Sequence, residues 1–276
     1  MPEPRYEKSL VWFRRDLRDY AHAALYHALK SSCRVYCAFV FDTEILDRLA
    51  DKADRRVEFI WESVRELQST LRGNAGDFIV RHGAARSEIP ALAQQLGVQA
   101  VFCNRDYEPA RDAAVAEALA AQGIAFHPFK DQVIFNCDEV LTQTGKPFGV
   151  FTPYKNAWLR KLEPFYLTAY PVEHYLDRLI TPPFPCHMLA LEDLGFQRTN
   201  LSALKLPTGM SGAARLFEDF WQRMERYAEA RDFPAVKGPS YLSVHLRFGT
   251  ISIRQLARAA WELGGRGAET WLSELI

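Results

Sequence analysis

The chain has 276 residues, 48% of them hydrophobic, and its 34 Lys and Arg side chains equal its 34 Asp and Glu side chains in number. This length and apolar content suffice for one large or two modest domains and exclude a largely disordered chain. The formal net charge of zero excludes a general electrostatic attraction to nucleic acid, so any DNA contact requires a local basic patch.

The first half of the chain is predicted to alternate buried strands with helices. Short β-prone apolar runs predict five strands, at residues 9–13, 35–41, 78–80, 100–102 and 124–129. Helical patterns lie between them, at residues 23–30, 55–71, 87–96 and 109–122. Ser87 is expected to cap the third of these helices. The β-α-β-α order predicts an α/β domain with a parallel, Rossmann-like sheet covered by helices on both faces.

The pattern changes after about residue 131. A short helix is expected at residues 156–162, and the proline-rich stretch 163–206 is expected to wrap over the first domain. Helices resume at residues 211–230 and 253–263, the second with Ser252 as its cap. We therefore predict an α/β domain over residues 1–135 that folds by itself, a connector over 136–206, and the beginning of an all-α domain over 207–276. The last seven residues are apolar and helix-like and end without a cap, which favours a truncated chain.

Cysteine usage and the N-terminus indicate the cellular compartment. The five cysteines form no C-x-x-C pair and are odd in number, so we expect free thiols in a reducing cytosol. The first nine residues lack the apolar run of a signal peptide, and no stretch reaches the roughly 20 apolar residues of a membrane helix. These features predict a cytoplasmic protein that does not associate with membranes.

The common catalytic and nucleotide-binding signatures are missing. The sequence contains no G-x-G-x-x-G after a strand, no Walker loop, no H-E-x-x-H and no G-x-S-x-G. Parallel sheets still bind ligands beyond the carboxyl ends of their strands. A stand-alone α/β ligand-binding module is therefore one alternative, although it would need a polar, capped end near residue 130 or 200, which the sequence lacks.

An unusual charged segment follows the first predicted strand. Residues 12–18 read WFRRDLR, which places three arginines and Asp16 at the edge where ligands gather. From its chemistry alone, the segment is either part of a ligand site or a charged turn in which Asp16 pairs with an arginine.

Five segments, taken in order, resemble the photolyase and cryptochrome family. They are WFRRDLR at 12–18, NRDYEP at 104–109, FTPYKNAW at 151–158, RDFPAV and GPSYLSVHLRFG within 231–249, and WLSELI at 271–276. The chain is most similar to class I enzymes that act on cyclobutane pyrimidine dimers. The resemblance implies a monomer that repairs ultraviolet-damaged DNA in the light, by electron transfer from reduced FAD. A cryptochrome-type flavin photoreceptor is the alternative within the family.

The family's helical domain extends well beyond the region that this chain matches. The resemblance therefore implies that residues 1–276 would not repair DNA alone. This sequence differs from the usual family pattern at one early position, because the family usually has an acidic residue where Ala21 and His22 stand. The loss of an acidic cap there is expected to cost the following helix about 1 kcal/mol.

The segment after Gly238 has the chemistry of a phosphate site. Ser240 and Ser243 are spaced to cap a helix start, where free N–H groups and the helix dipole favour an anion. An ordinary Ser-capped helix has the same pattern. The resemblance implies that FAD is bound by Tyr227, Ser240, Tyr241, Leu242 and Ser243. The family usually has Thr where Pro239 stands, so one phosphate contact is expected to be absent.

Trp271 and Glu274 are three residues apart and are predicted to share one face of a helix. The resemblance implies that this face looks into the pocket that receives the dimer, which must leave the base stack to be reached. In the family, the carboxylate corresponding to Glu274 hydrogen-bonds a pyrimidine edge and stabilises the dimer radical anion. A solvated helix charge is the simpler reading of Glu274.

Asn104 and Glu108 follow the fourth predicted strand, at the edge of the crevice. The resemblance implies that they contact an antenna chromophore, methenyltetrahydrofolate in some relatives and a deazaflavin in others. We expect the folate. Glu108 alternatively serves as a carboxylate beside Pro109 that interacts favourably with the helix dipole.

Overall fold

A five-stranded parallel sheet forms the centre of the first half of the chain. The structure is a computed structural model that describes residues 4–276, so the first three residues of the predicted α/β domain lie outside it. The strands are β1 (Tyr6–Phe13), β2 (Ser32–Asp42), β3 (Phe78–Gly83), β4 (Ala100–Asn104) and β5 (Ala125–Phe129). Their order is β3-β2-β1-β4-β5, and every neighbouring pair is parallel. The predicted parallel sheet is confirmed, and its topological switch point lies between β1 and β4.

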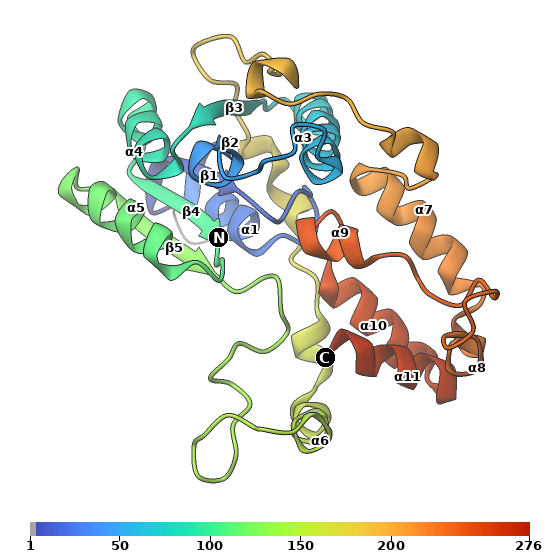
Figure 1. The fold of residues 1–276 in the computed structure, drawn as a ribbon. Helices are drawn as coiled ribbons and strands as arrows, with labels where there is room; N and C mark the ends of the chain where they lie inside the picture. Colours follow the sequence, from blue (N-terminus) through green and yellow to red (C-terminus); the bar gives the residue numbers. More distant parts are fainter. Residues whose placement is uncertain (1–3) are drawn as a thin grey trace.

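Helices cover both faces of this sheet (Figure 1). They are α1 (Ala23–Ser31), α2 (Thr43–Leu46), α3 (Arg55–Gly73), α4 (Ala85–Leu96) and α5 (Pro109–Ala121). In β1, Val11 and Phe13 pack on the face covered by α1 and α3, whereas Leu10 and Trp12 pack on the face covered by α4 and α5. Both faces are apolar because both are buried, which explains the continuous apolar runs of the sequence.

Two helix starts differ from the sequence prediction. The helix α4 begins at Ala85 rather than at Ser87, and the Asp42 carboxylate at the end of β2 accepts the Ala85 N–H at 3.3 Å. The helix α1 does not lack a cap, because the Nδ1 atom of His22 accepts the Leu25 N–H at 3.0 Å. The expected loss of about 1 kcal/mol at α1 is therefore wrong, since a histidine supplies the acceptor that the missing acid would have supplied.

The two parts of the connector pack against different halves of the molecule. It contains α6 (Phe151–Lys161) and four 3-10 turns, η1 (Pro164–Leu167), η2 (Val172–Arg178), η3 (Glu192–Leu194) and η4 (Leu201–Leu204). Apolar side chains from Ile134 to Leu167 pack against the C-terminal helices, whereas those from Val172 to Leu201 pack against the sheet and α3. Only the second part of the predicted wrapping segment therefore covers the sheet.

The C-terminal helices form a separate layer beside the sheet (Figure 1). They are α7 (Gly209–Trp221), η5 (Met224–Arg226), α8 (Tyr227–Ala230), α9 (Ser243–Phe248), α10 (Ile253–Leu263) and α11 (Gly265–Leu275). The single helix predicted over 211–230 is broken after Trp221, where Arg223 leaves helical geometry with a φ of −132°. Ser252 occupies the N-cap position of α10, but its hydroxyl accepts no bond from that helix. No helix within residues 4–276 is long and apolar enough to cross a membrane.

Candidate functional site

A cavity of about 180 Å³ opens at the carboxyl ends of β1, β2 and β4. Its walls combine apolar side chains such as Trp12 and Phe39 with four arginines, Arg14, Arg15, Arg111 and Arg247. The position follows from the topology, because the strand order reverses between β1 and β4, and the helices that follow these two strands lie on opposite faces of the sheet. We call this cavity the crevice.

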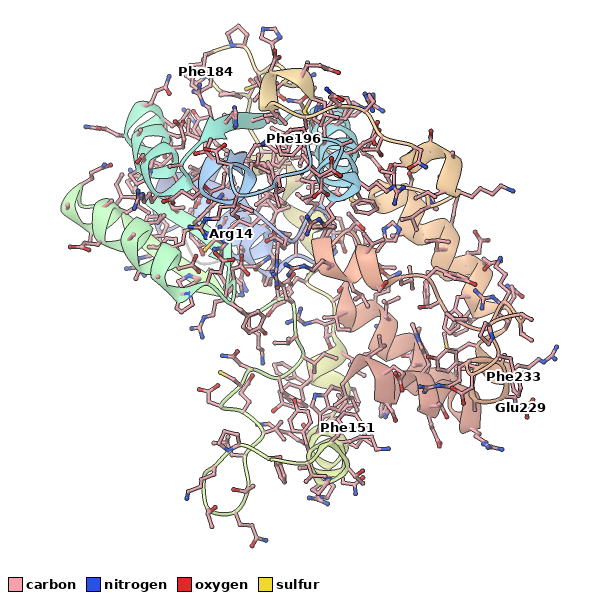
Figure 2. The ribbon with its side chains drawn as sticks, in the orientation of Figure 1. Arg14, Phe151, Phe184, Phe196, Glu229 and Phe233 are labelled. Carbon is pink, nitrogen blue, oxygen red and sulfur yellow. The ribbon has the colours of Figure 1, made fainter. Side chains whose placement is uncertain are left out.

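Acidic side chains hold the crevice arginines in place. Arg111 lies 2.9 Å from Asp106 and 3.2 Å from Asp42. Arg14, which is labelled in Figure 2, is the innermost example. It pairs with Asp112 of α5, and its guanidinium lies 4.4 Å from the centre of the Trp12 ring. The Nε atoms of Arg14, Arg15 and Arg111 are buried and have no hydrogen-bond partner among the described residues. What the crevice offers a ligand is therefore its four positive side chains and its apolar walls.

The structure separates the two residues predicted to contact an antenna. Glu108 lies on the rim of the crevice, 64% exposed and 3.7 Å from Arg111, and caps α5 with no side-chain bond. Asn104 is buried and does not line the crevice. Its amide donates to Asp16 at 2.8 Å and accepts the Ala24 N–H at 2.9 Å. Asn104 therefore supports the loop below the crevice, whereas Glu108 is accessible to a ligand.

The Asp16 carboxylate organises the loop after β1. It lies 3.0 Å from the Nε2 atom of His22 and accepts the Arg14 N–H at 2.6 Å. Burial alone would raise the pKa of Asp16, but the neighbouring His22 and Arg14 groups hold it below its usual value. Asp16 forms the turn, but the side chains that it contacts are His22 and Asn104 rather than an arginine. Arg14 and Arg15 line the crevice.

The predicted phosphate segment forms a turn that precedes α9, in which Tyr241 is exposed and Leu242 is buried. Neither serine caps this helix: its N-cap position is Leu242, with no side-chain bond, and Ser243 is already its first residue. The Ser240 hydroxyl instead accepts the Leu242 N–H at 3.4 Å within the turn. Tyr241 has a φ of 58°, which is uncommon for a residue other than glycine. The capping prediction is wrong because the N-cap position falls on Leu242, two residues after Ser240 and one before Ser243.

Arg223 holds this turn, and the sequence contains no signal for its role. Its guanidinium donates to the carbonyls of Lys237 and Gly238 at 2.7 Å and of Pro239 at 2.9 Å. Asp219 pairs with it at 3.1 Å. Arg223 therefore fixes the backbone of residues 237–239, which leads into Ser240.

Tyr227, Trp271 and Glu274 meet where α8 packs on α11. Tyr227 and Trp271 are both buried and share one neighbour, the Phe220 ring, at 5.7 and 4.7 Å between ring centres. Burial raises the pKa of the Tyr227 hydroxyl. The Glu274 carboxylate is half-exposed. The structure therefore groups the three residues, with Trp271 directed into the core and Glu274 toward solvent.

Comparisons with known proteins agree with this arrangement. A family model described as DNA photolyase matches residues 9–174, more than half of the chain. Deoxyribodipyrimidine photo-lyase of Vibrio cholerae is 32% identical over 97% of this chain and 59% of its own length. An uncharacterised 31.6 kDa protein of Synechococcus sp. (strain PCC 6716) is 32% identical over 92% of this chain and 89% of its own length. The chain thus spans little more than half of the photo-lyase relative.

Solved structures show the same fold. A class III photolyase from Agrobacterium tumefaciens superposes with a TM-score of 0.84 at 24% identity, over 99% of this chain and 57% of that protein. A cryptochrome from Synechocystis sp. superposes with a TM-score of 0.79 at 20% identity, over 100% of this chain and 60% of that protein.

Proposed function

This chain belongs to the DNA photolyase family, and we propose that it forms the antenna-binding part and one wall of the flavin site of a deoxyribodipyrimidine photo-lyase. The reaction is the light-driven splitting of cyclobutane pyrimidine dimers in ultraviolet-damaged DNA. One observation carries the proposal: the turn at 238–243 and the group of Tyr227, Trp271 and Glu274 lie on the same layer of helices. The protein acts as a monomer in the cytoplasm under this proposal.

The chain's own residues bind and orient the flavin rather than perform redox chemistry. Reduced FAD, when bound, supplies the electron. Arg223 keeps the turn in place, so the Ser240 and Ser243 hydroxyls and the backbone at Tyr241 and Leu242 face the flavin phosphates. Pro239 lacks an N–H and a hydroxyl, so that position contributes no donor.

Tyr227 and Trp271 give the flavin site a rigid aromatic wall, because both rings pack on Phe220. Glu274 binds a pyrimidine edge of the extruded dimer. The Arg231 guanidinium competes for the same carboxylate at 2.6 Å, so Glu274 exchanges this partner when it binds substrate.

We assign the crevice to the antenna, with methenyltetrahydrofolate as the proposed ligand and a deazaflavin as the alternative. Its apolar walls fit a planar ring, and its arginines fit an anionic group. Glu108 contacts the ligand from the rim. Asn104 acts indirectly, through Asp16 and the loop that carries Arg14 and Arg15.

The test compares residues 1–276 alone with a chain extended by the C-terminal part of the photo-lyase relative that this chain does not match. We expect the longer protein to carry flavin absorbance and to remove dimers from irradiated oligonucleotides under blue light, and the shorter one to do neither. Bound flavin without repair would identify a cryptochrome-type photoreceptor. A protein that binds no flavin but binds a ligand in the crevice would identify an α/β ligand-binding module.

A further inference from the structure

A buried ion network joins the sheet to the C-terminal helices. Asp131, directly after β5, pairs with Arg18 of the loop after β1 and, at 3.1 Å, with Arg254 of α10. The three side chains are at most 5% exposed. Their elements are more than 100 residues apart in sequence, so the network is a tertiary joint between the two layers.

Backbone groups from three segments complete the joint. Arg18 donates to the Gly249 carbonyl at 3.0 Å, and Arg254 donates to the Lys130 carbonyl at 3.2 Å. The Asp131 carboxylate also accepts the Ala23 N–H, at the start of α1, at 3.2 Å. One carboxylate therefore connects α1, the loop after β1 and α10.

Charge explains why Asp131 stays ionised in this position. Burial would raise its pKa, but the positive charges of Arg18 and Arg254, together with His22, hold the pKa below its usual value, although Asp16 opposes them. Two buried guanidinium groups share this one carboxylate. Removing the charge of Asp131 would leave these two buried guanidinium groups without their shared counter-charge, which is destabilising.

The joint lies between the two proposed chromophore sites. Beside it, the Leu17 N–H donates to the Phe248 carbonyl at 3.1 Å. Phe248 and Arg247 end α9 and line the crevice, while α9 begins at Ser243 of the flavin turn. Helix α10, which carries Arg254, packs directly on α11, which carries Trp271. The orientation of the helices relative to the crevice therefore depends on this contact.

We propose that Asp131 is a positioning residue, which sets the distance and orientation between the crevice and helices α9–α11. Parts of one chain that meet through a polar interface move relative to each other unless something restrains them. Asp131 supplies that restraint through three elements at once. Its value to the protein rests on the proposed function, because transfer of light energy between two chromophores depends steeply on their separation and orientation.

The deciding experiment measures the distance between the two layers. Spin labels are attached at Cys33, which is exposed at the start of β2, and at Glu269→Cys in α11, with Cys137→Ser removing the other exposed thiol. Asp131→Asn keeps the size of the side chain and removes its charge. Glu262→Gln makes the same chemical change in the exposed Arg258–Glu262 pair of α10 and is the matched control.

We expect a narrow distance distribution in the parent and in the control, and a broadened or shifted one in Asp131→Asn. The measurement is made well below the unfolding midpoint, with unchanged circular dichroism. A distribution for Asp131→Asn that superposes on the control overturns the proposal. If Asp131→Asn does not fold, Arg254→Met removes the link to α10 while Arg18 remains paired, and the same comparison applies.

Hydrogen exchange separates positioning from general support of the fold. In Asp131→Asn, amides of α10 and α11 should exchange faster by at least about tenfold, while those of β1 and β4 keep their protection. Equal loss of protection in both layers overturns the positioning role. Neither readout requires a chromophore. Failure of the extended chain to bind flavin would contradict the proposed function and leave this test intact.

Discussion

The Arg231 guanidinium, at the end of α8, lies 2.6 Å from the Glu274 carboxylate of α11. This ion pair therefore holds the residue that is expected to bind the dimer. Both side chains are partly exposed, at 29% and 46%. Exposed pairs of this kind contribute at most about 1 kcal/mol to stability. Arg231 therefore orients Glu274 without making it essential to the fold.

Glu274→Ala should impair repair without affecting folding. In the protein with a complete flavin site, we expect weaker dimer binding by about 1–3 kcal/mol, the range for losing a hydrogen bond to a charged group. Repair per absorbed photon should also fall, and flavin content should stay the same. The control is Glu269→Ala, an exposed carboxylate on the same helix. Repair that is equal in the two variants would remove Glu274 from the substrate site.

Arg223→Met should release the turn that precedes α9. The variant loses three donors to backbone carbonyls, so we expect flavin occupancy to fall and stability to drop by about 1–3 kcal/mol. Arg226→Met changes an exposed arginine nearby and serves as the control. The measurements are flavin absorbance after purification and urea unfolding. Full flavin content in Arg223→Met would show that the turn holds its shape without this anchor.

His245 should make stability depend on pH. Its side chain is buried beside Thr250, and burial lowers its pKa from 6.5 to about 4, although the carbonyls of Pro207 and Gly209 favour the charged form. Between these values the unfolded chain binds a proton that the folded chain does not. The free energy of unfolding should therefore fall as the pH drops from about 6.5 to about 4, by up to about 3 kcal/mol.

Substitution of His245 provides the check on this pH dependence. His245→Gln should flatten the decline in that window, whatever its effect on stability at neutral pH. His187→Gln, at an exposed position, should leave the decline unchanged. The measurement is urea unfolding at a series of pH values. A decline of equal slope in both variants would assign it to other groups.

Gly249→Ala should destabilise the contact between the two layers. Gly249 has a φ of 65°, and a Cβ atom there would lie 2.3 Å from the Arg15 carbonyl oxygen. Gly97 has a nearly equal φ of 63° with no atom close to the same position. Gly97→Ala should cost about 1–2 kcal/mol for the backbone conformation alone. Gly249→Ala should lower the free energy of unfolding, measured in urea, clearly more than Gly97→Ala does. An equal loss would show that the loop after β1 moves aside to accommodate the Cβ atom.

The boundary of the first folding unit should lie later than residue 135. The part of the connector from Val172 to Leu201 contributes buried side chains to the core between the sheet and α3. Residues 1–206 should therefore unfold cooperatively, whereas residues 1–135 should bind a hydrophobic dye and melt over a broad range. Circular dichroism during heating makes the comparison. A sharp transition for residues 1–135 would support the boundary predicted from the sequence.

The amino-acid sequence by itself determined the sheet, the family and the segments that could form a site. A strand such as 35–41 is continuously apolar because both faces of a parallel sheet are buried, so its pattern is local and readable. The same holds for the WFRRDLR and GPSYLSVHLRFG segments, whose residues act together because they are adjacent in the chain. Such features depend on neighbours a few residues away.

Only the tertiary structure decided which side chains complete the site. Asp42 supplies an acceptor to a helix 43 residues later, and Asp131 pairs with arginines 113 and 123 residues away. Asn104 lies in a segment typical of a ligand contact, yet its amide is hydrogen-bonded to Asp16 and Ala24 below the crevice. A buried polar group takes whichever partner the packed chain brings within hydrogen-bonding distance, and no local pattern in the sequence encodes that distance.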